Sequence, residues 1–141
     1  MDLDPAVWGP HFWFFLHTLS VCYPVRPTKS IKKKSYDFIM NLPIFIPNHG
    51  IGNKIAHLID DFPVTPYLDS RLSFMKWVHF MHNKINANLH KEEIGFRKGL
   101  ELYYSAYRQI PQHVKNKQNK NTTYTTVIVI ICVLIISIYN K

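Results

Sequence analysis

Apolar and aromatic residues recur at spacings of three and four along most of the first 108 residues, and almost no stretch alternates as a strand does. Prolines, glycines and capping residues divide this pattern into segments. We expect helices at about 10–23, 29–42, 54–60, 70–89 and 92–108, with a loop over 43–53. The pattern therefore predicts an all-α fold, a small bundle of four or five helices, followed by one further apolar segment.

The first expected helix is rich in aromatic residues. Pro10 suits the first turn of a helix, where its missing N–H leaves no hydrogen bond unmade, and Pro24 ends the helix. Trp13 and His17 are four residues apart, so they share one face. Taken alone, such residues indicate ordinary core packing, and a single histidine among them indicates a satisfied core side chain.

The fourth expected helix carries polar residues inside an apolar stripe. The stripe consists of Leu72, Met75, Val78, His82, Ile85, Asn86 and Leu89. His82 and Asn86 lie one turn apart with Asn83 adjacent, and they need partners because a buried unsatisfied donor costs about 1–3 kcal/mol. Two interpretations are open: a side-chain network within the core, or a polar, ring-shaped ligand between this helix and the first.

Residues 122–139 are uncharged and mostly apolar. As a helix this segment would be about 27 Å long, close to the thickness of the hydrocarbon core of a bilayer. Tyr124 and Tyr139 lie near its ends, where aromatic rings favour the headgroup level. We expect a single-pass transmembrane tail anchor, with a buried helix or a strand as the alternative. The expected organisation is a helical domain at 1–110, a polar basic linker at 111–121 and the anchor at 122–139.

The formal net charge of +8 comes largely from two basic runs, at 29–34 and 115–120. No aromatic residues interleave with the second run and no zinc-finger pattern is present, which argues against nucleic acid as a partner. The second run precedes the expected anchor, so the positive-inside rule places the helical domain on the cytosolic side of the membrane. The lysines there would contact anionic lipid.

The chain has two cysteines, Cys22 and Cys132, which form no CxxC motif, metal-ligand set or disulfide framework. The acidic, proline-interrupted N-terminus does not resemble a signal peptide. We therefore expect the domain to fold in a reducing, cytosolic setting without a metal site.

Two separated motifs resemble those of the Erv/ALR family of FAD-linked sulfhydryl oxidases. The first motif, WGxxxWxxLHxxxxxYP, is matched by Trp8, Gly9, Trp13, Leu16, His17, Tyr23 and Pro24. The second motif, HNxVNxxLGK, is matched by His82, Asn83, Asn86, Leu89 and Lys91, with Ile85 in place of valine. Their order and separation fit the family, and the resemblance covers about residues 7–108.

The resemblance implies a small helical bundle that binds FAD noncovalently and forms a homodimer, or a heterodimer with a paralogue. It implies that the cofactor contacts are Trp8, Gly9, Trp13, His17, Tyr23, His82, Asn83, Asn86 and Lys91. It also implies that dithiols, including those of a partner protein, are oxidised to disulfides while oxygen is reduced to hydrogen peroxide. The tail anchor resembles forms found in large DNA viruses, and this resemblance implies a host membrane or a virion as the location.

The sequence departs from the family at the point where electrons enter the flavin. The family's CxxC, at the start of the third helix, aligns with Asn48 and Ile51, and neither side chain can form a disulfide. His90 replaces the glycine of the second motif. Neither Cys22 nor Cys132 is expected to take over, because a single thiol cannot become an internal disulfide.

Two functional hypotheses follow. In the first, the chain binds FAD and oxidises the thiols of a partner directly at the flavin. In the second, which the missing CxxC favours, the chain is a catalytically silent, membrane-tethered FAD-binding module for dimerisation or partner binding. An unrelated helical, membrane-anchored adaptor is a third interpretation.

Overall fold

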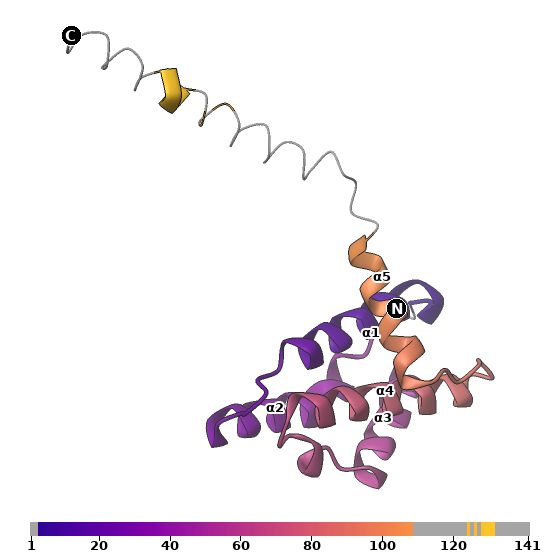
Figure 1. The fold of residues 1–141 in the computed structure, drawn as a ribbon. Helices are drawn as coiled ribbons and strands as arrows, with labels where there is room; N and C mark the ends of the chain where they lie inside the picture. Colours follow the sequence, from indigo (N-terminus) through magenta and orange to yellow (C-terminus); the bar gives the residue numbers. More distant parts are fainter. Residues whose placement is uncertain (1–2, 109–123, 125, 127, 132–141) are drawn as a thin grey trace, which may run out of the picture. The chain divides into compact units, whose positions relative to one another are not determined.

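The computed structural model describes residues 3–108, 124, 126 and 128–131, and the expected all-α fold is confirmed for this part of the chain. The elements, in order, are α1 (Pro5–Cys22), α2 (Lys29–Asn41), the 3-10 helix η1 (Leu42–Phe45), α3 (His49–Asp61), the 3-10 helix η2 (Thr65–Tyr67), α4 (Arg71–Asn88) and α5 (Phe96–Arg108) (Figure 1). Met1–Tyr103 form one compact unit, which is described below, and Tyr104–Lys141 form another.

Helix α1 begins more than one turn earlier than the sequence pattern predicts. Asp4 caps it, because its side chain accepts a hydrogen bond from the Ala6 backbone N–H at 2.8 Å, and Pro5 occupies the first helical position. The expected start at Pro10 was wrong, and this proline lies inside the helix. The earlier start places Trp8 on the helix rather than before it.

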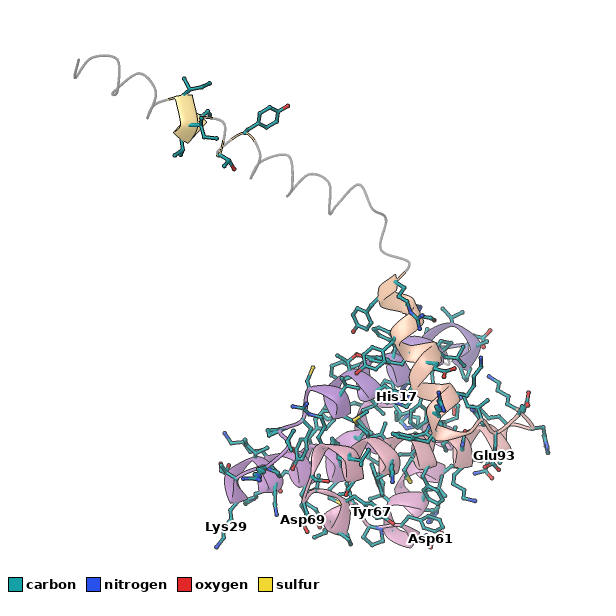
Figure 2. All side chains as sticks on the ribbon, in the orientation of Figure 1. His17, Lys29, Asp61, Tyr67, Asp69 and Glu93 are labelled. Carbon is teal, nitrogen blue, oxygen red and sulfur yellow. The ribbon has the colours of Figure 1, made fainter. Side chains whose placement is uncertain are left out.

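The core lies where α1 packs along α4; α3 and η2 also contact α4, and η1 contacts α2 and α3. The buried side chains of the core include Leu16, Ile39 from α2, Ile55, Val64 just before η2, Trp77, Val78 and Ile85. The indole N–H of Trp77 donates to the Phe62 carbonyl at 2.9 Å, which satisfies the one polar atom of this large side chain. In Figure 2, charged residues such as Lys29, Asp61 and Glu93 lie at the periphery, whereas His17 lies inside.

The buried face of α4 is broader than the predicted stripe. Leu72 and Leu89, expected to face the core, are 54% and 38% exposed. Phe74, Trp77 and Met81 are buried instead, because α1 and α3 both pack against α4 and together cover more than one narrow stripe.

Helix α3 begins within the segment that was expected to be a loop. Asn48 caps it, and the Asn48 Oδ1 accepts a hydrogen bond from the Ile51 N–H at 3.0 Å. Gly52, on the first turns, lies against η1 so closely that a Cβ there would be 2.9 Å from the Pro43 carbonyl oxygen. The expected start at Lys54 was therefore wrong by more than one turn.

The end of α4 corrects the expected start of α5. His90 adopts a left-handed backbone conformation with φ 55°. Its N–H bonds to the Ala87 carbonyl at 3.0 Å, and the Lys91 N–H bonds to the Asn86 carbonyl at 2.8 Å, a Schellman arrangement. The chain then runs without helical structure to Phe96, so Glu92 does not begin the fifth helix as expected.

No helix in the described residues has both the length and the apolar character needed to cross a bilayer. The linker expected at 111–121 and most of the anchor expected at 122–139 lie outside the residues that the structure describes.

Replacing His90 with glycine should stabilise the protein. The left-handed conformation strains a residue that has a Cβ, so His90→Gly should raise the free energy of unfolding by about 0.5–1 kcal/mol, after allowing for the extra chain entropy of glycine. Urea unfolding of the full chain measures the change. His90→Ala, which keeps a Cβ, is the matched control, and an equal gain in both variants would contradict the explanation.

Candidate functional site

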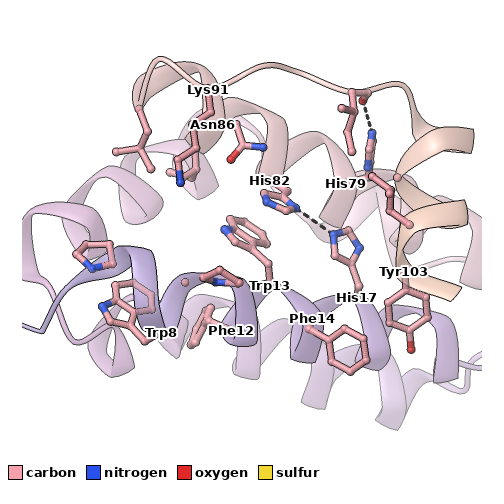
Figure 3. A pocket seen from close by; sticks show the side chains of 18 of the residues that line it. Trp8, Phe12, Trp13, Phe14, His17, His79, His82, Asn86, Lys91 and Tyr103 are labelled. Carbon is pink, nitrogen blue, oxygen red and sulfur yellow. Dashed lines mark hydrogen bonds between the residues drawn. The ribbon is translucent and has the colours of Figure 1, made fainter. Parts of the chain in front are cut away.

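A cavity of about 460 Å³ opens between α1, α3, α4 and the start of α5. Its wall from α1 is largely aromatic, with Trp8, Phe12, Trp13 and His17, and α3 adds Ile51 and Ile55. The rest of the lining comes largely from α4 and the segment that follows it, namely His79, His82, Ile85, Asn86, Leu89, Lys91 and Ile94. The cavity thus brings together both motifs identified in the sequence (Figure 3).

The two motifs meet through three side chains. The rings of Trp13 and His82 stack with their centroids 4.2 Å apart and their planes only 8° from parallel. His17 Nε2 and His82 Nδ1 are joined by a hydrogen bond of 3.1 Å (Figure 3). We call Trp13, His17 and His82 the aromatic triad. It places a flat aromatic surface and an imidazole pair along one side of the cavity.

Both imidazoles of the triad are uncharged at neutral pH. Burial lowers the pKa of His17 to about 4, with a smaller contribution from His79. Burial also lowers the pKa of His82 to about 4, followed by the effects of His17, His79 and Lys91. Each neutral ring has one donor nitrogen and one acceptor nitrogen, so in their shared hydrogen bond one ring donates and the other accepts. The far nitrogen of each ring remains to donate or accept.

Polar groups lie at the other end of the cavity. Asn86, which is half-buried near the C-terminus of α4, supplies an amide, and Lys91 supplies an exposed ammonium group (Figure 3). The Schellman arrangement positions Lys91, because its backbone N–H is bonded to the Asn86 carbonyl. The left-handed conformation of His90 therefore provides the backbone turn for which glycine is the usual residue.

Two of the expected cofactor contacts lie outside this cavity. Tyr23 is 5% exposed in the core, where its hydroxyl donates to the Leu68 carbonyl at 2.9 Å and its carbonyl accepts from Arg71 Nε. Asn83 points to the segment after α4, where its amide nitrogen donates to the Ile94 carbonyl at 2.8 Å. Both residues serve the scaffold around the cavity in this structure. The other expected contacts, Trp8, Gly9, Trp13, His17, His82, Asn86 and Lys91, all line the cavity.

The two positions that align with the family's cysteines are bonded to each other through the α3 cap. Ile51 lines the cavity as an apolar wall, and its backbone N–H donates to the side chain of Asn48. Cys22 is exposed and free near the end of α1 and does not line the cavity. Among the described residues, no group of histidines, cysteines and carboxylates is arranged to hold a metal ion.

Sequence reasoning missed His79, Phe12, Ile94 and Tyr103 as cavity residues. His79 could have been found, because it precedes His82 by three residues and so shares its side of α4. Ile94 and Tyr103 carry no comparable signal, since their approach depends on how the chain returns after α4. 

The residues present suit a ligand that combines a planar aromatic ring with a negatively charged part. The cavity volume falls in the range of small-molecule sites, roughly 300–1,000 Å³. Aromatic rings stack on flat ligands, neutral imidazoles and an amide can donate to or accept from ring heteroatoms, and Lys91 can neutralise a phosphate. FAD has each of these features, so the donor set fits this cofactor.

The imidazole pair makes stability depend on pH. Because the pKa of each ring is about 4 in the folded protein and 6.5 in the unfolded chain, the unfolded state binds more protons between these values. Stability should be full above about pH 6.5 and fall by on the order of 3 kcal/mol towards pH 4, after allowance for partial exposure. Urea unfolding across this range tests it. His82→Asn should flatten the dependence, and an unchanged slope would contradict the assignment.

Comparisons with known proteins agree with this geometry. A family model described as the Erv1/Alr family matches residues 10–108. The chain is 27% identical over 100 residues to the "Probable FAD-linked sulfhydryl oxidase R368" of Acanthamoeba polyphaga mimivirus, covering 70% of each protein. It is 28% identical over 88 residues to the mitochondrial FAD-linked sulfhydryl oxidase erv1 of Schizosaccharomyces pombe, covering 62% of this chain and 48% of the relative.

The fold is similar to that of the yeast Erv1 core, with a TM-score of 0.64 at 21% identity, covering 79% of this chain and 89% of the core. The FAD-binding domain of Erv1 from Saccharomyces cerevisiae is similar at a TM-score of 0.62 and 23% identity, covering 74% and 92%. Since the family model spans well over half of the 141 residues, the chain belongs to the Erv1/Alr family, whose members named here are FAD-linked sulfhydryl oxidases.

Proposed function

We propose that this chain binds FAD in the cavity between α1, α4 and the start of α5. The observation that carries the proposal is the aromatic triad, which joins the two sequence motifs on one wall of a cavity of suitable size. When bound in a sulfhydryl oxidase, FAD accepts the two electrons released as a pair of thiols becomes a disulfide, and oxygen then takes them. The proposal for this chain concerns how its residues hold that cofactor.

Each lining residue has a distinct role in the proposed site. Trp8 and Trp13 offer flat surfaces for the cofactor's ring systems, and the triad imidazoles offer uncharged hydrogen-bonding nitrogens. Asn86 binds polar edges of the cofactor through its amide. Lys91, which is exposed and lines the cavity, would balance the charge of the cofactor's phosphates.

We further propose that the chain does not pass electrons through a disulfide of its own. Asn48 and Ile51 occupy the α3 N-terminus, where the family carries its cysteines, and the exposed Cys22 does not line the cavity. On this proposal the protein is a flavin-binding member of a sulfhydryl oxidase family without an internal dithiol relay. The second candidate function is direct oxidation of a partner's thiols at the flavin. On this candidate, the partner's thiols would approach the flavin beside Ile51, which lines the cavity.

Restoring the cysteines should restore turnover. The full-length chain purified in detergent should show a visible flavin absorption band and consume little oxygen with dithiothreitol. The double variant Asn48→Cys/Ile51→Cys should raise the rate of oxygen consumption by more than about a hundredfold, because it supplies the dithiol next to the cavity. Oxygen-electrode assays and absorption spectra make the measurement.

The single variants Asn48→Cys and Ile51→Cys are the matched controls, since one cysteine cannot form an internal disulfide, and both should remain near the wild-type rate. A colourless wild-type protein would reject FAD binding. Rapid oxygen consumption by a yellow wild-type protein would reject the proposal that the chain is catalytically silent, and would favour direct oxidation of external thiols at the flavin. A yellow double variant without any gain would show that the α3 N-terminus does not face the cofactor's reactive ring.

A second copy of the chain is the proposed partner of the apolar face on α1 and α2. Phe15 and Phe38 are 49% and 38% exposed there and meet edge to face, with ring centroids 6.5 Å apart. Burial of such side chains stabilises homodimers. The wild type should sediment as a dimer, whereas Phe15→Glu/Phe38→Glu should sediment as a folded monomer. Lys29→Glu, an exposed change near the start of α2, is the control, and a dimeric double variant would refute this face.

We propose that the apolar run within 122–139 anchors the protein in a membrane. The helical domain would then lie on the same side of the membrane as the lysines that precede the run. The full chain expressed in cells should remain in the membrane pellet after carbonate extraction, while a chain ending at residue 114 should be released. Release of both forms would reject the anchor.

A further inference from the structure

The segment between α4 and α5, residues 89–95, forms part of the cavity wall but has few anchors. Lys91 and Ile94 line the cavity, yet every residue of this segment except Ile94 is exposed. At its N-terminal end, the Schellman hydrogen bonds hold the segment to α4. Near its C-terminal end, Ile94 is the one residue whose backbone is bound by side chains of α4 among the described hydrogen bonds.

Two α4 side chains hold the Ile94 backbone. The Asn83 amide nitrogen donates to the Ile94 carbonyl at 2.8 Å, and Asn83 Oδ1 accepts from the Ile94 N–H at 3.3 Å. His79 Nε2 lies 2.8 Å from the same carbonyl. Since a carbonyl oxygen can only accept, His79 Nε2 carries the proton of this bond. We call His79, Asn83 and Ile94 the Ile94 latch (Figure 3 shows the bond from His79).

His79 also fixes the start of α5. Its ring is 7% exposed and contacts Phe96 edge to face, with centroids 5.5 Å apart. A Cβ at Gly99 would lie 2.6 Å from His79 Cε1 and 2.8 Å from its Nδ1, so only glycine permits this approach of α5. A single imidazole thus joins α4, the segment 89–95 and the first turn of α5.

The parts that His79 joins are those that close the cavity opposite α1. Gly99, Leu102 and Tyr103 line the cavity from α5, in addition to Lys91 and Ile94 from the segment before it. His79 itself lines the cavity, with its ring centroid 6.4 Å from that of His17. Any movement of the latch therefore moves a wall of the cavity rather than a remote surface.

We propose that His79 and Asn83 are positioning residues that hold residues 89–99 closed over the bound cofactor and thereby set how long the cofactor is retained. This inference rests on the proposed binding of FAD in the same cavity. The latch acts on release because its hydrogen bonds tie an otherwise exposed segment to a buried helix face. Opening that segment requires these bonds to break, whereas the core between α1 and α4 stays packed.

The rate of FAD release tests the latch. Release from the full-length protein is followed by the fluorescence of the freed flavin after dilution. His79→Leu and Asn83→Leu should each speed release by about tenfold, the factor that corresponds to one buried hydrogen bond. His79→Gln, whose amide can donate to the Ile94 carbonyl, should recover most of the wild-type retention. Val64→Ala, a cavity-forming change in the core away from the latch, is the control for lost stability.

A double-mutant cycle tests the role of Gly99. Gly99→Ala should speed release in the wild type, because its Cβ would meet the His79 ring, but should change it little in a His79→Ala background, where the ring is absent. Additive effects of the two substitutions would contradict the packing argument.

Hydrogen exchange of the flavin-free protein separates the latch from the cofactor. Exchange at Ile94 and through residues 96–99 should increase by about tenfold in His79→Leu and remain unchanged in Val64→Ala. If the purified wild-type protein contains no flavin, the proposed function is rejected. The exchange measurement still tests the Ile94 latch in that case, because it uses flavin-free protein. Flavin release no faster in His79→Leu than in Val64→Ala, or equal exchange in both, would overturn the proposal.

Discussion

The contact of α1 with α4 through Trp13, His17 and His82 is the interaction on which the site depends. The indole stacks on one imidazole, and that imidazole bonds to the other, so residues 65 positions apart in the chain are fixed within one hydrogen-bonded group. Ring stacking and hydrogen bonding restrict orientation as well as distance. The two helices therefore present their aromatic surfaces to one cavity in a defined arrangement.

Burial determines the chemistry of this group. Removing the imidazoles from water favours their neutral forms and is the main reason that the pKa of each is low; His79 adds to the effect on both rings, and His17 adds to the effect on His82. If the imidazoles of the aromatic triad were charged, they would attract the anionic part of a ligand as Lys91 does. Because the imidazoles are neutral, the fixed positive charge is left to Lys91, at the exposed end. The cavity thus separates a flat aromatic region from a region suited to phosphate.

The same scaffold accommodates two departures from the family motifs by different means. At His90, the backbone adopts the left-handed conformation in spite of a Cβ, and the Schellman hydrogen bonds keep Lys91 in place. At Asn48 and Ile51, the side chains provide a helix cap and an apolar wall, which preserve the start of α3 but have no redox chemistry. The first departure keeps Lys91 at the cavity, whereas the second leaves these two positions without the dithiol of the family motif.

The sequence by itself determined the helical class, the two motifs and the loss of the cysteines, because helical periodicity and residue identity are local properties. It did not determine the helix starts at Pro5, His49 and Phe96, which depend on the capping side chains of Asp4 and Asn48 and on the turn at His90. Most of the motif residues line the cavity. Tyr23 and Asn83 do not, and the sequence could not show this, since a motif shows that a residue is present but not which way its side chain points. Only the tertiary structure decided that His79 and Gly99 meet, because that contact arises from the return of the chain after α4, and no spacing in the sequence encodes the direction of that return.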